Sequence, residues 1–203
     1  MRITWIRLIF IALIGIAAFQ HYGHGPFLHS SVIHGPGVLA AEDPQQTAVS
    51  VAEPQTIHGY QITALANFNI KARVLARTNY YLGREAELSP VDLALGWGRM
   101  SDEAVLEQID IRQSNRFYYW HVNAFPIPRQ EIESHSANMH MIPADARIEK
   151  ILKSARVGQL VHLRGYLVEA KSADGWRWQS SLTRNDTGNG ACELLLVQSA
   201  AVF

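Results

Sequence analysis

The first twenty residues constrain the fold most, because they join a basic lead to an apolar run. Arg2 and Arg7 precede twelve uncharged, mostly apolar residues at positions 8–19, and no acidic residue occurs before Glu42. This order is typical of a segment that directs a chain to a membrane. The run is long enough for a signal peptide and, extended backwards, approaches the length of a spanning helix. We therefore assign residues 1–20 to a signal peptide or an N-terminal membrane anchor.

Residues 21–56 have the composition of a flexible linker. Gly, Pro, Ser, Gln and His recur, and the apolar positions follow no sustained period. The remaining residues, 57–203, have the length of one ordinary domain. We therefore predict a leader, a linker and a single globular domain.

The charge balance and the single cysteine exclude several classes of protein. The chain carries 18 basic and 18 acidic residues, so it lacks the positive field that attracts nucleic acid, and we expect no nucleic-acid partner. Cys192 is the one cysteine of the sequence, which excludes an internal disulfide and a multi-cysteine zinc site. We expect no cofactor.

The domain mixes strand and helix patterns. Residues 70–77 alternate apolar with mostly basic side chains, and 116–122 are rich in aromatic residues, so both ranges predict strands. Ser89 and Pro90 are typical of a helix start and predict a helix over 89–95. The most regular helical pattern runs over 144–155 and ends before Gly158.

Strand patterns follow that helix at 160–168, 176–182 and 192–197 and predict an antiparallel meander. Gly165, inside the first of them, marks a bend or bulge by which a small sheet curls. We predict a mixed α+β fold, mainly antiparallel β, after an N-terminal hydrophobic helix. The sheet forms a small OB-like, partly open barrel or a curled sheet with short helical insertions. The alternative is an α+β sheet with its helices on one face.

Three phrases resemble a group of uncharacterised single-domain bacterial envelope proteins. They are LSPVDLALGWGRMSD at 88–102, SANMH at 136–140, and SSLTR at 180–184 continuing to GACEL at 190–194. The resemblance covers roughly residues 70–197. It implies one domain behind a short leader and transfers no catalytic residue. With the arginines of the lead on the cytoplasmic side, the location predicted is the bacterial inner membrane facing the periplasm, or the periplasm if the leader is cleaved.

The segment 135–141 has the composition of a catalytic loop. It places two imidazoles, a hydroxyl and an amide close together, and His135 or His140 as general base would need a nucleophile from elsewhere, Ser181 or Cys192. The catalytic candidates are therefore His135, His140 and Ser181. The alternative is that these groups and Asn138 make structural hydrogen bonds, because buried polar groups are normally paired.

Aromatic side chains and one polar turn are the ligand-binding candidates. Tyr118 and Trp120, like Trp176 and Trp178, offer rings on which a sugar or peptide can stack, although core packing explains them equally. The glycine-rich turn 184–190 can receive an anion on its backbone amides or a cation on a carboxylate, although a hairpin turn is the simpler explanation. The full set of candidates is Asn138, Tyr118, Trp120, Arg184 and Asp186.

Four histidines lie close together after the apolar run. Neutral imidazoles bind zinc, copper or nickel, so a flexible tether can wrap weakly around a metal. The segment lacks carboxylates, and its spacing matches no closed site, so a polar tether is the alternative. The residues concerned are His21, His24, His29 and His34.

The sequence favours a non-enzymatic module that binds a ligand or a protein. No catalytic motif is present, and a membrane contact through the N-terminus leaves the domain free for an envelope protein partner. The alternative is a small periplasmic hydrolase that uses His135 or His140 with Ser181 or Cys192.

The leader generates a test of location. Alkaline phosphatase fused after Phe203 is expected to be active, because the enzyme needs disulfides that form outside the cytoplasm. Deletion of residues 1–20 serves as the control and is expected to abolish the activity. An inactive phosphatase fusion beside a fluorescent cytoplasmic fusion contradicts the prediction.

Overall fold

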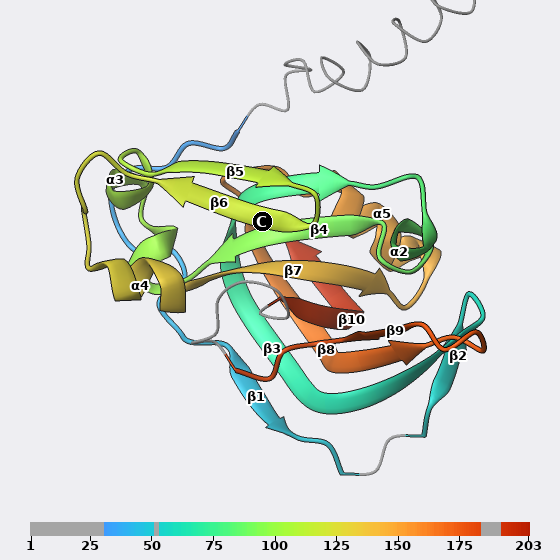
Figure 1. Ribbon diagram of the computed structural model, residues 1–203. Coiled ribbons are helices and arrows are strands. Elements are labelled where there is room, and N and C mark those ends of the chain that lie inside the picture. The colour runs from blue at the N-terminus through green and yellow to red at the C-terminus, as the bar shows by residue number, and fades with distance from the viewer. Residues whose placement is uncertain (1–30, 51–52, 184–191) are drawn as a thin grey trace, which may run out of the picture. The chain divides into compact units, whose positions relative to one another are not determined.

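The computed structural model describes residues 31–50, 53–183 and 192–203. The predicted N-terminal hydrophobic helix lies outside these residues. In the part of the chain that the structure describes, no helix has the length and apolar character needed to cross a membrane. The unit 31–203 has a mixed α+β fold in which short helices flank a largely antiparallel sheet, as predicted (Figure 1).

The elements alternate irregularly along the chain. The strands are β1 (Gln45–Ala48), β2 (Gln55–Ile57), β3 (Tyr60–Asn79), β4 (Val91–Gly96), β5 (Asp110–Ser114), β6 (Phe117–His121), β7 (Ser136–Pro143), β8 (Leu160–Lys171), β9 (Arg177–Gln179) and β10 (Glu193–Val202). The helices are α2 (Arg84–Leu88), the 3₁₀ helix η1 (Gly98–Ser101), α3 (Glu103–Leu106), α4 (Arg129–Ser134) and α5 (Ala146–Ser154).

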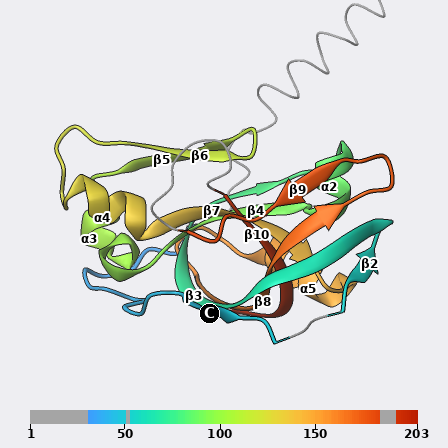
Figure 2. The same ribbon diagram turned by 60° about the horizontal axis from the view of Figure 1, so that its bottom comes forward.

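The strands close into a ring because β3 pairs on both sides. Its second half pairs with β4, while residues 61–73 pair with β8. From β4 the ring continues through β7, β10 and β8, and every pairing is antiparallel except that of β7 with β10. Figures 1 and 2 show the long curve of β3 that this closure requires. Strands β1, β2 and β9 extend the sheet at its edges.

Local irregularities allow the strands to curve. The β3 register shifts at Ala64/Ala66 and again at Val74/Ala76, and the β10 register shifts at Val197/Ser199. Gly165 of β8 pairs with Val197 next to this last shift, and a Cβ at position 165 would lie 1.8 Å from the Leu196 carbonyl oxygen. The predicted irregularity is therefore real, but its bulge lies on β10, while glycine permits the close approach of β8.

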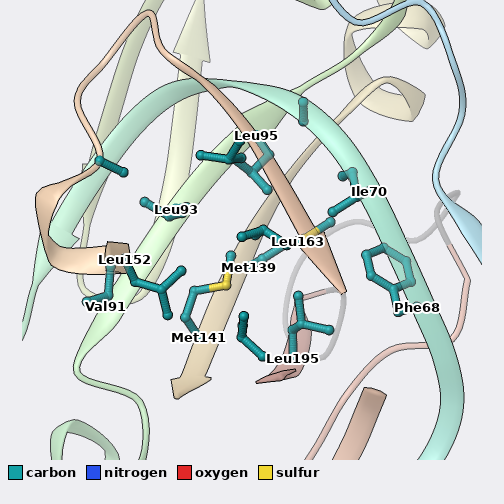
Figure 3. Close-up of a cluster of buried hydrophobic side chains, with 14 of the residues drawn as sticks. Phe68, Ile70, Val91, Leu93, Leu95, Met139, Met141, Leu152, Leu163 and Leu195 are labelled. Atoms are coloured by element: carbon teal, nitrogen blue, oxygen red, sulfur yellow. The ribbon is translucent and has the colours of Figure 1, made fainter. Parts of the chain in front are cut away.

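Alternate residues of the ring strands fill its interior (Figure 3). On β4 these are Val91, Leu93 and Leu95, which alternate with residues of the outer face. Helix α5, predicted over 144–155, adds Ile148 and Leu152 to this core. The apolar side chains labelled in Figure 3 are Phe68, Ile70, Val91, Leu93, Leu95, Met139, Met141, Leu152, Leu163 and Leu195.

The predicted helix over 89–95 is wrong, because residues 91–96 form β4. All six are buried, so a strand covered on both faces satisfies the apolar run better than a helix with one wet side. The cover on the outer face comes from residues 97–135, which include the β5–β6 hairpin (Figures 1 and 2). A second apolar core joins this insertion to the sheet through Leu75, Ala94, Met100, Ile109, Ile127 and Ile132.

Residues 32–48 pack on the domain, whereas the sequence predicted a flexible linker there. The Ser101 hydroxyl accepts hydrogen bonds from the backbone amides of Leu39 (3.1 Å) and Ala40 (3.0 Å). Strand β1 pairs with β3 over four residues. The composition misled the prediction because backbone hydrogen bonds, rather than a periodic apolar face, attach this segment.

The Ser101 hydroxyl provides a test of this attachment. Ser101→Ala leaves one buried and one half-buried amide without an acceptor and is expected to lower the free energy of unfolding by about 2 kcal/mol in urea titrations. In a chain that starts at Val51 the same substitution is expected to cost much less, because the amides of Leu39 and Ala40 are absent. Equal losses in both backgrounds would contradict this attachment.

Candidate functional site

Two buried titratable side chains face each other on the outer surface of the ring. Asp92 of β4 and His140 of β7 are paired across the strands, and their side chains are 0% and 3% exposed. Asp92 Oδ1 lies 3.0 Å from His140 Nδ1, although the contact lacks the geometry of a hydrogen bond. The second oxygen, Asp92 Oδ2, has no hydrogen-bond partner within the described ranges. Such a carboxylate is stable only beside a positive charge.

Arg116 supplies that charge from the turn of the β5–β6 hairpin. Its Nη1 donates to Asp92 Oδ1 at 2.7 Å and to the Ser89 carbonyl at 2.9 Å. The turn consists of Asn115 and Arg116, with φ angles of 51° and 69°, as a two-residue hairpin turn of type I′ requires. Arginine is unfavourable in this left-handed conformation, so the contacts of its side chain offset a local strain.

Amide side chains hold the hairpin over the sheet. Asn138 Nδ2 donates to the Arg116 carbonyl at 2.8 Å, and its Oδ1 accepts a hydrogen bond from the Gln113 amide. Thr78 Oγ1 in turn donates to Gln113 Oε1 at 2.9 Å. Asn138 is buried, so its role in the described structure is to position Arg116 rather than to face solvent.

Aromatic rings continue outward from this ion cluster. The Arg116 guanidinium lies 3.6 Å from the ring centroid of Tyr80 and 5.7 Å from that of Trp178. The Trp178 ring lies 4.8 Å from the His140 ring and 6.1 Å from Trp176. We call the half-buried rings of Tyr80, Trp176 and Trp178 the aromatic strip.

The electrostatics of the strip depend on Arg116 and Asp92. Burial and the neighbouring Asp92 carboxylate raise the pKa of Tyr80 to about 12, so its ring stays neutral and electron-rich beneath the cation. At the other end Arg84 lies 5.6 Å from the Trp176 ring. The strip therefore presents half-buried rings with Arg116 and Arg84 against them, an arrangement that suits stacking with planar or apolar groups.

The structure does not bring the catalytic candidates together. The His140 ring makes no hydrogen bond to Ser181 or Cys192 in the described part of the chain. Ser181 Oγ instead donates to the Thr183 carbonyl at 3.0 Å and accepts from the Thr183 amide at 3.1 Å, which closes a local turn. Cys192 is half-buried rather than enclosed, with Sγ 4.0 Å from the Arg116 carbonyl.

His135 belongs to a different region from His140. It follows α4, and its Nδ1 lies 2.9 Å from the Ser134 hydroxyl. Its other neighbours are Asp43, 3.8 Å from Nε2, and the Trp97 ring. The two histidines share none of these partners, so their closeness in sequence does not create a joint site.

Tyr118 and Trp120 point into the second core rather than joining the aromatic strip. The Tyr118 hydroxyl lies 2.5 Å from Ser136 Oγ, and burial raises the pKa of Tyr118 to about 12. The Trp120 ring packs 6.2 Å from Phe125. Their location favours a packing role. Arg184 and Asp186 lie outside the described residues.

The one described member of the predicted histidine cluster has a structural role. The His34 amide donates to Glu103 Oε2 at 2.8 Å, and its Nε2 lies 3.0 Å from the Gly158 carbonyl. Within the described ranges no three His, Cys, Asp or Glu side chains are grouped as metal ligands. His21, His24 and His29 lie outside those ranges.

Sequence reasoning named Trp176 and Trp178 as stacking candidates, with core packing as the alternative, but did not select Asp92, Arg116 or Tyr80. Asp92 was detectable as the one charge within a fully apolar stretch. Asn115 and Arg116 gave no hairpin signal of the Asn-Gly kind, because the second position of a type I′ turn favours glycine and disfavours arginine. Comparisons with protein-family models, curated proteins and solved structures found no match to this chain.

The Arg116–Asp92 pair generates a stability prediction. Arg116→Met leaves a buried carboxylate without its cation and is expected to lower the free energy of unfolding by about 3 kcal/mol. Adding Asp92→Asn is expected to recover most of that loss, because it removes the unpaired charge. Arg112→Met, at a side chain that is 78% exposed, is the control and should change stability by less than about 0.5 kcal/mol. Urea denaturation of the four proteins measures these effects, and a double variant no more stable than Arg116→Met contradicts them.

Proposed function

We propose that this chain is an exported or membrane-anchored, non-enzymatic binding module with an OB-like barrel, whose ligand binds on the aromatic strip. The observation that carries the proposal is the place of the strip relative to the ring of strands. In OB-like barrels the face of the second and third strands, with the loops that join strands one to two and four to five, binds the ligand.

The strand order supports this assignment of the barrel. We number the five ring strands one to five along the chain, as β3, β4, β7, β8 and β10. Their order around the closed ring is then one, two, three, five and four. Strands three and five are parallel, and α5 lies between strands three and four. A five-stranded barrel of this kind is expected to use its second and third strands as the ligand-binding face.

The residues of the strip occupy the expected positions. Tyr80 lies between β3 and β4, while Trp176 and Trp178 lie between β8 and β10, within or beside β9. Asp92 and His140, on the second and third strands, form the floor beneath them. The β5–β6 hairpin narrows this face and brings Arg116 to it.

The contacts favour binding over hydrolysis. His140 is buried and directed at Asp92 and Trp178, and it makes no hydrogen bond to the proposed nucleophiles within the described residues. The balanced charge also disfavours single-stranded nucleic acid, for which stacking rings are normally accompanied by a basic groove. A peptide or protein segment with a planar or apolar side chain fits the strip better. An envelope protein reached by the N-terminal tether is the partner we propose.

Capture from membranes tests the proposal. The full chain carrying a photo-crosslinker beside the strip is used to isolate partners from the envelope fraction, followed by mass spectrometry. Trp178→Ala is expected to lose the partner that the wild-type chain captures, because the stacking surface is gone. Tyr119→Ala removes an aromatic residue that is 55% exposed on β6 and should retain the partner.

The fold of each variant is checked by cooperative melting before capture. A partner that Trp178→Ala retains, in a folded protein, excludes the strip as the binding surface. Hydrolysis of ester or amide substrates that Ser181→Ala abolishes would replace the proposal with the hydrolase alternative.

A further inference from the structure

A polar hollow lies on the outer face of β1, β3 and β8. Residues paired across strands share a face, so Gln45, Asn69 and Arg164 form one row. Thr47, Asn67 and Tyr166 form the next row. Figure 1 shows these three strands side by side in the lower part of the view. The hollow that they line has a volume of about 280 Å³.

Internal hydrogen bonds hold part of this surface rigid. Asn69 Nδ2 donates to Gln45 Oε1 at 3.0 Å, and Asn69 Oδ1 lies 2.8 Å from His162 Nε2. Asn67 Nδ2 donates to the Ala48 carbonyl at 2.9 Å and to Thr47 Oγ1 at 3.3 Å. The amide planes are therefore fixed before any ligand arrives, which lowers the entropy lost on binding.

Several polar groups in the hollow remain available. Asn67 Oδ1, the Tyr166 hydroxyl and the Gln198 side-chain amide have no hydrogen-bond partner within the described ranges. Gln198 lies at the register shift of β10, where the strand bulges beside Gly165. Because of the bulge, β10 becomes the fourth strand that lines the hollow. It supplies the side-chain amide of Gln198, which takes no part in the hydrogen bonds of the described sheet.

Arg164 gives the hollow its charge. Its Nε lies 3.3 Å from His162 Nε2, but that nitrogen cannot accept a hydrogen bond while it donates its own hydrogen to Asn69. No described carboxylate pairs with Arg164, and none of the residues that line the hollow is acidic. Burial, with Arg164 and Lys71 nearby, lowers the pKa of His162, which agrees with an uncompensated positive field.

We propose that this hollow binds a carboxylate-bearing sugar, with the carboxylate on Arg164 and the hydroxyls on the amide groups. Arginine matches a carboxylate with two parallel hydrogen bonds. Asn67 Oδ1 and the Gln198 amide offer both acceptors and donors, as sugar hydroxyls require. The half-buried ring of Tyr166 can cover the apolar face of a sugar ring.

The chemistry favours a sugar acid over a simple inorganic anion. Asn67 Oδ1, whose amide plane is fixed, would repel a phosphate or sulfate, whereas a hydroxyl hydrogen satisfies it. The volume also exceeds what a small anion fills, and it lies near the lower end of the range for small-molecule pockets. The proposal shares no residue with the aromatic strip, so its test is independent of the proposed function.

Saturation-transfer NMR on the full chain tests the assignment with glucuronate, glucose and acetate as probes. Glucuronate is expected to bind saturably, and glucose and acetate at least about tenfold more weakly, because each lacks half of the recognised groups. Arg164→Gln is expected to weaken glucuronate binding about tenfold, and Asn67→Ala severalfold. Arg147→Gln removes an equal charge from an exposed position on α5 and should leave binding unchanged.

Three results would overturn the proposal. The first is the absence of saturable glucuronate binding at concentrations on the order of 50 mM, since single-sugar affinities of this kind lie near the millimolar range. The second is unchanged glucuronate binding in a folded Arg164→Gln protein. The third is acetate binding equal to that of glucuronate. The last result would reduce the hollow to a simple anion site.

Discussion

The double pairing of β3 is the constraint on which the rest of the structure depends. This strand of 20 residues contributes to both sides of the ring, so every other ring strand is placed directly or indirectly by its register. A one-residue slip would turn Phe68 and Ile70 outward and bring Asn67 and Asn69 into the apolar interior. The burial of alternate apolar residues therefore fixes at once the core and the outward polar face.

A group of buried polar side chains depends on the strand register that β3 sets. The outer face of β4 and β7 carries three buried polar residues, Asp92, Asn138 and His140. Burial of such groups costs free energy unless they are hydrogen-bonded or their charge is compensated. The inserted hairpin both covers them and supplies Arg116. Buried ion pairs contribute little net stability, but they strongly penalise arrangements that separate the charges. The cluster of Asp92, His140 and Arg116 thus specifies where the hairpin lies. The Trp178 ring packs against Arg116 and His140, so its position depends on the same cluster.

The sequence predicted the general fold better than the site. Period-two alternation identified strands such as 70–77 and 160–168, and amphipathic spacing identified α5, because those signals arise within a few neighbouring residues. The helix predicted over 89–95 failed because cover on both faces of β4 comes from residues distant in sequence. For the same reason, one candidate segment contained both His135 and His140 although the two side chains have different neighbours. Asp92 and Arg116 meet only through sheet register and a hairpin turn, neither of which a linear pattern reveals.

The parallel pairing of β7 with β10 has a consequence for the order of folding. Met139 pairs with Glu193, so the contact that closes the ring joins segments separated by helix α5 and strands β8 and β9. The Phe203 amide, directly after β10, donates to the Leu160 carbonyl. Residues 193–202 must therefore be in place before the ring can close. Strands β3 and β4 can pair early as local contacts, whereas closure depends on the pairing of β10 with β7 and β8 and makes long-range pairing the slow step.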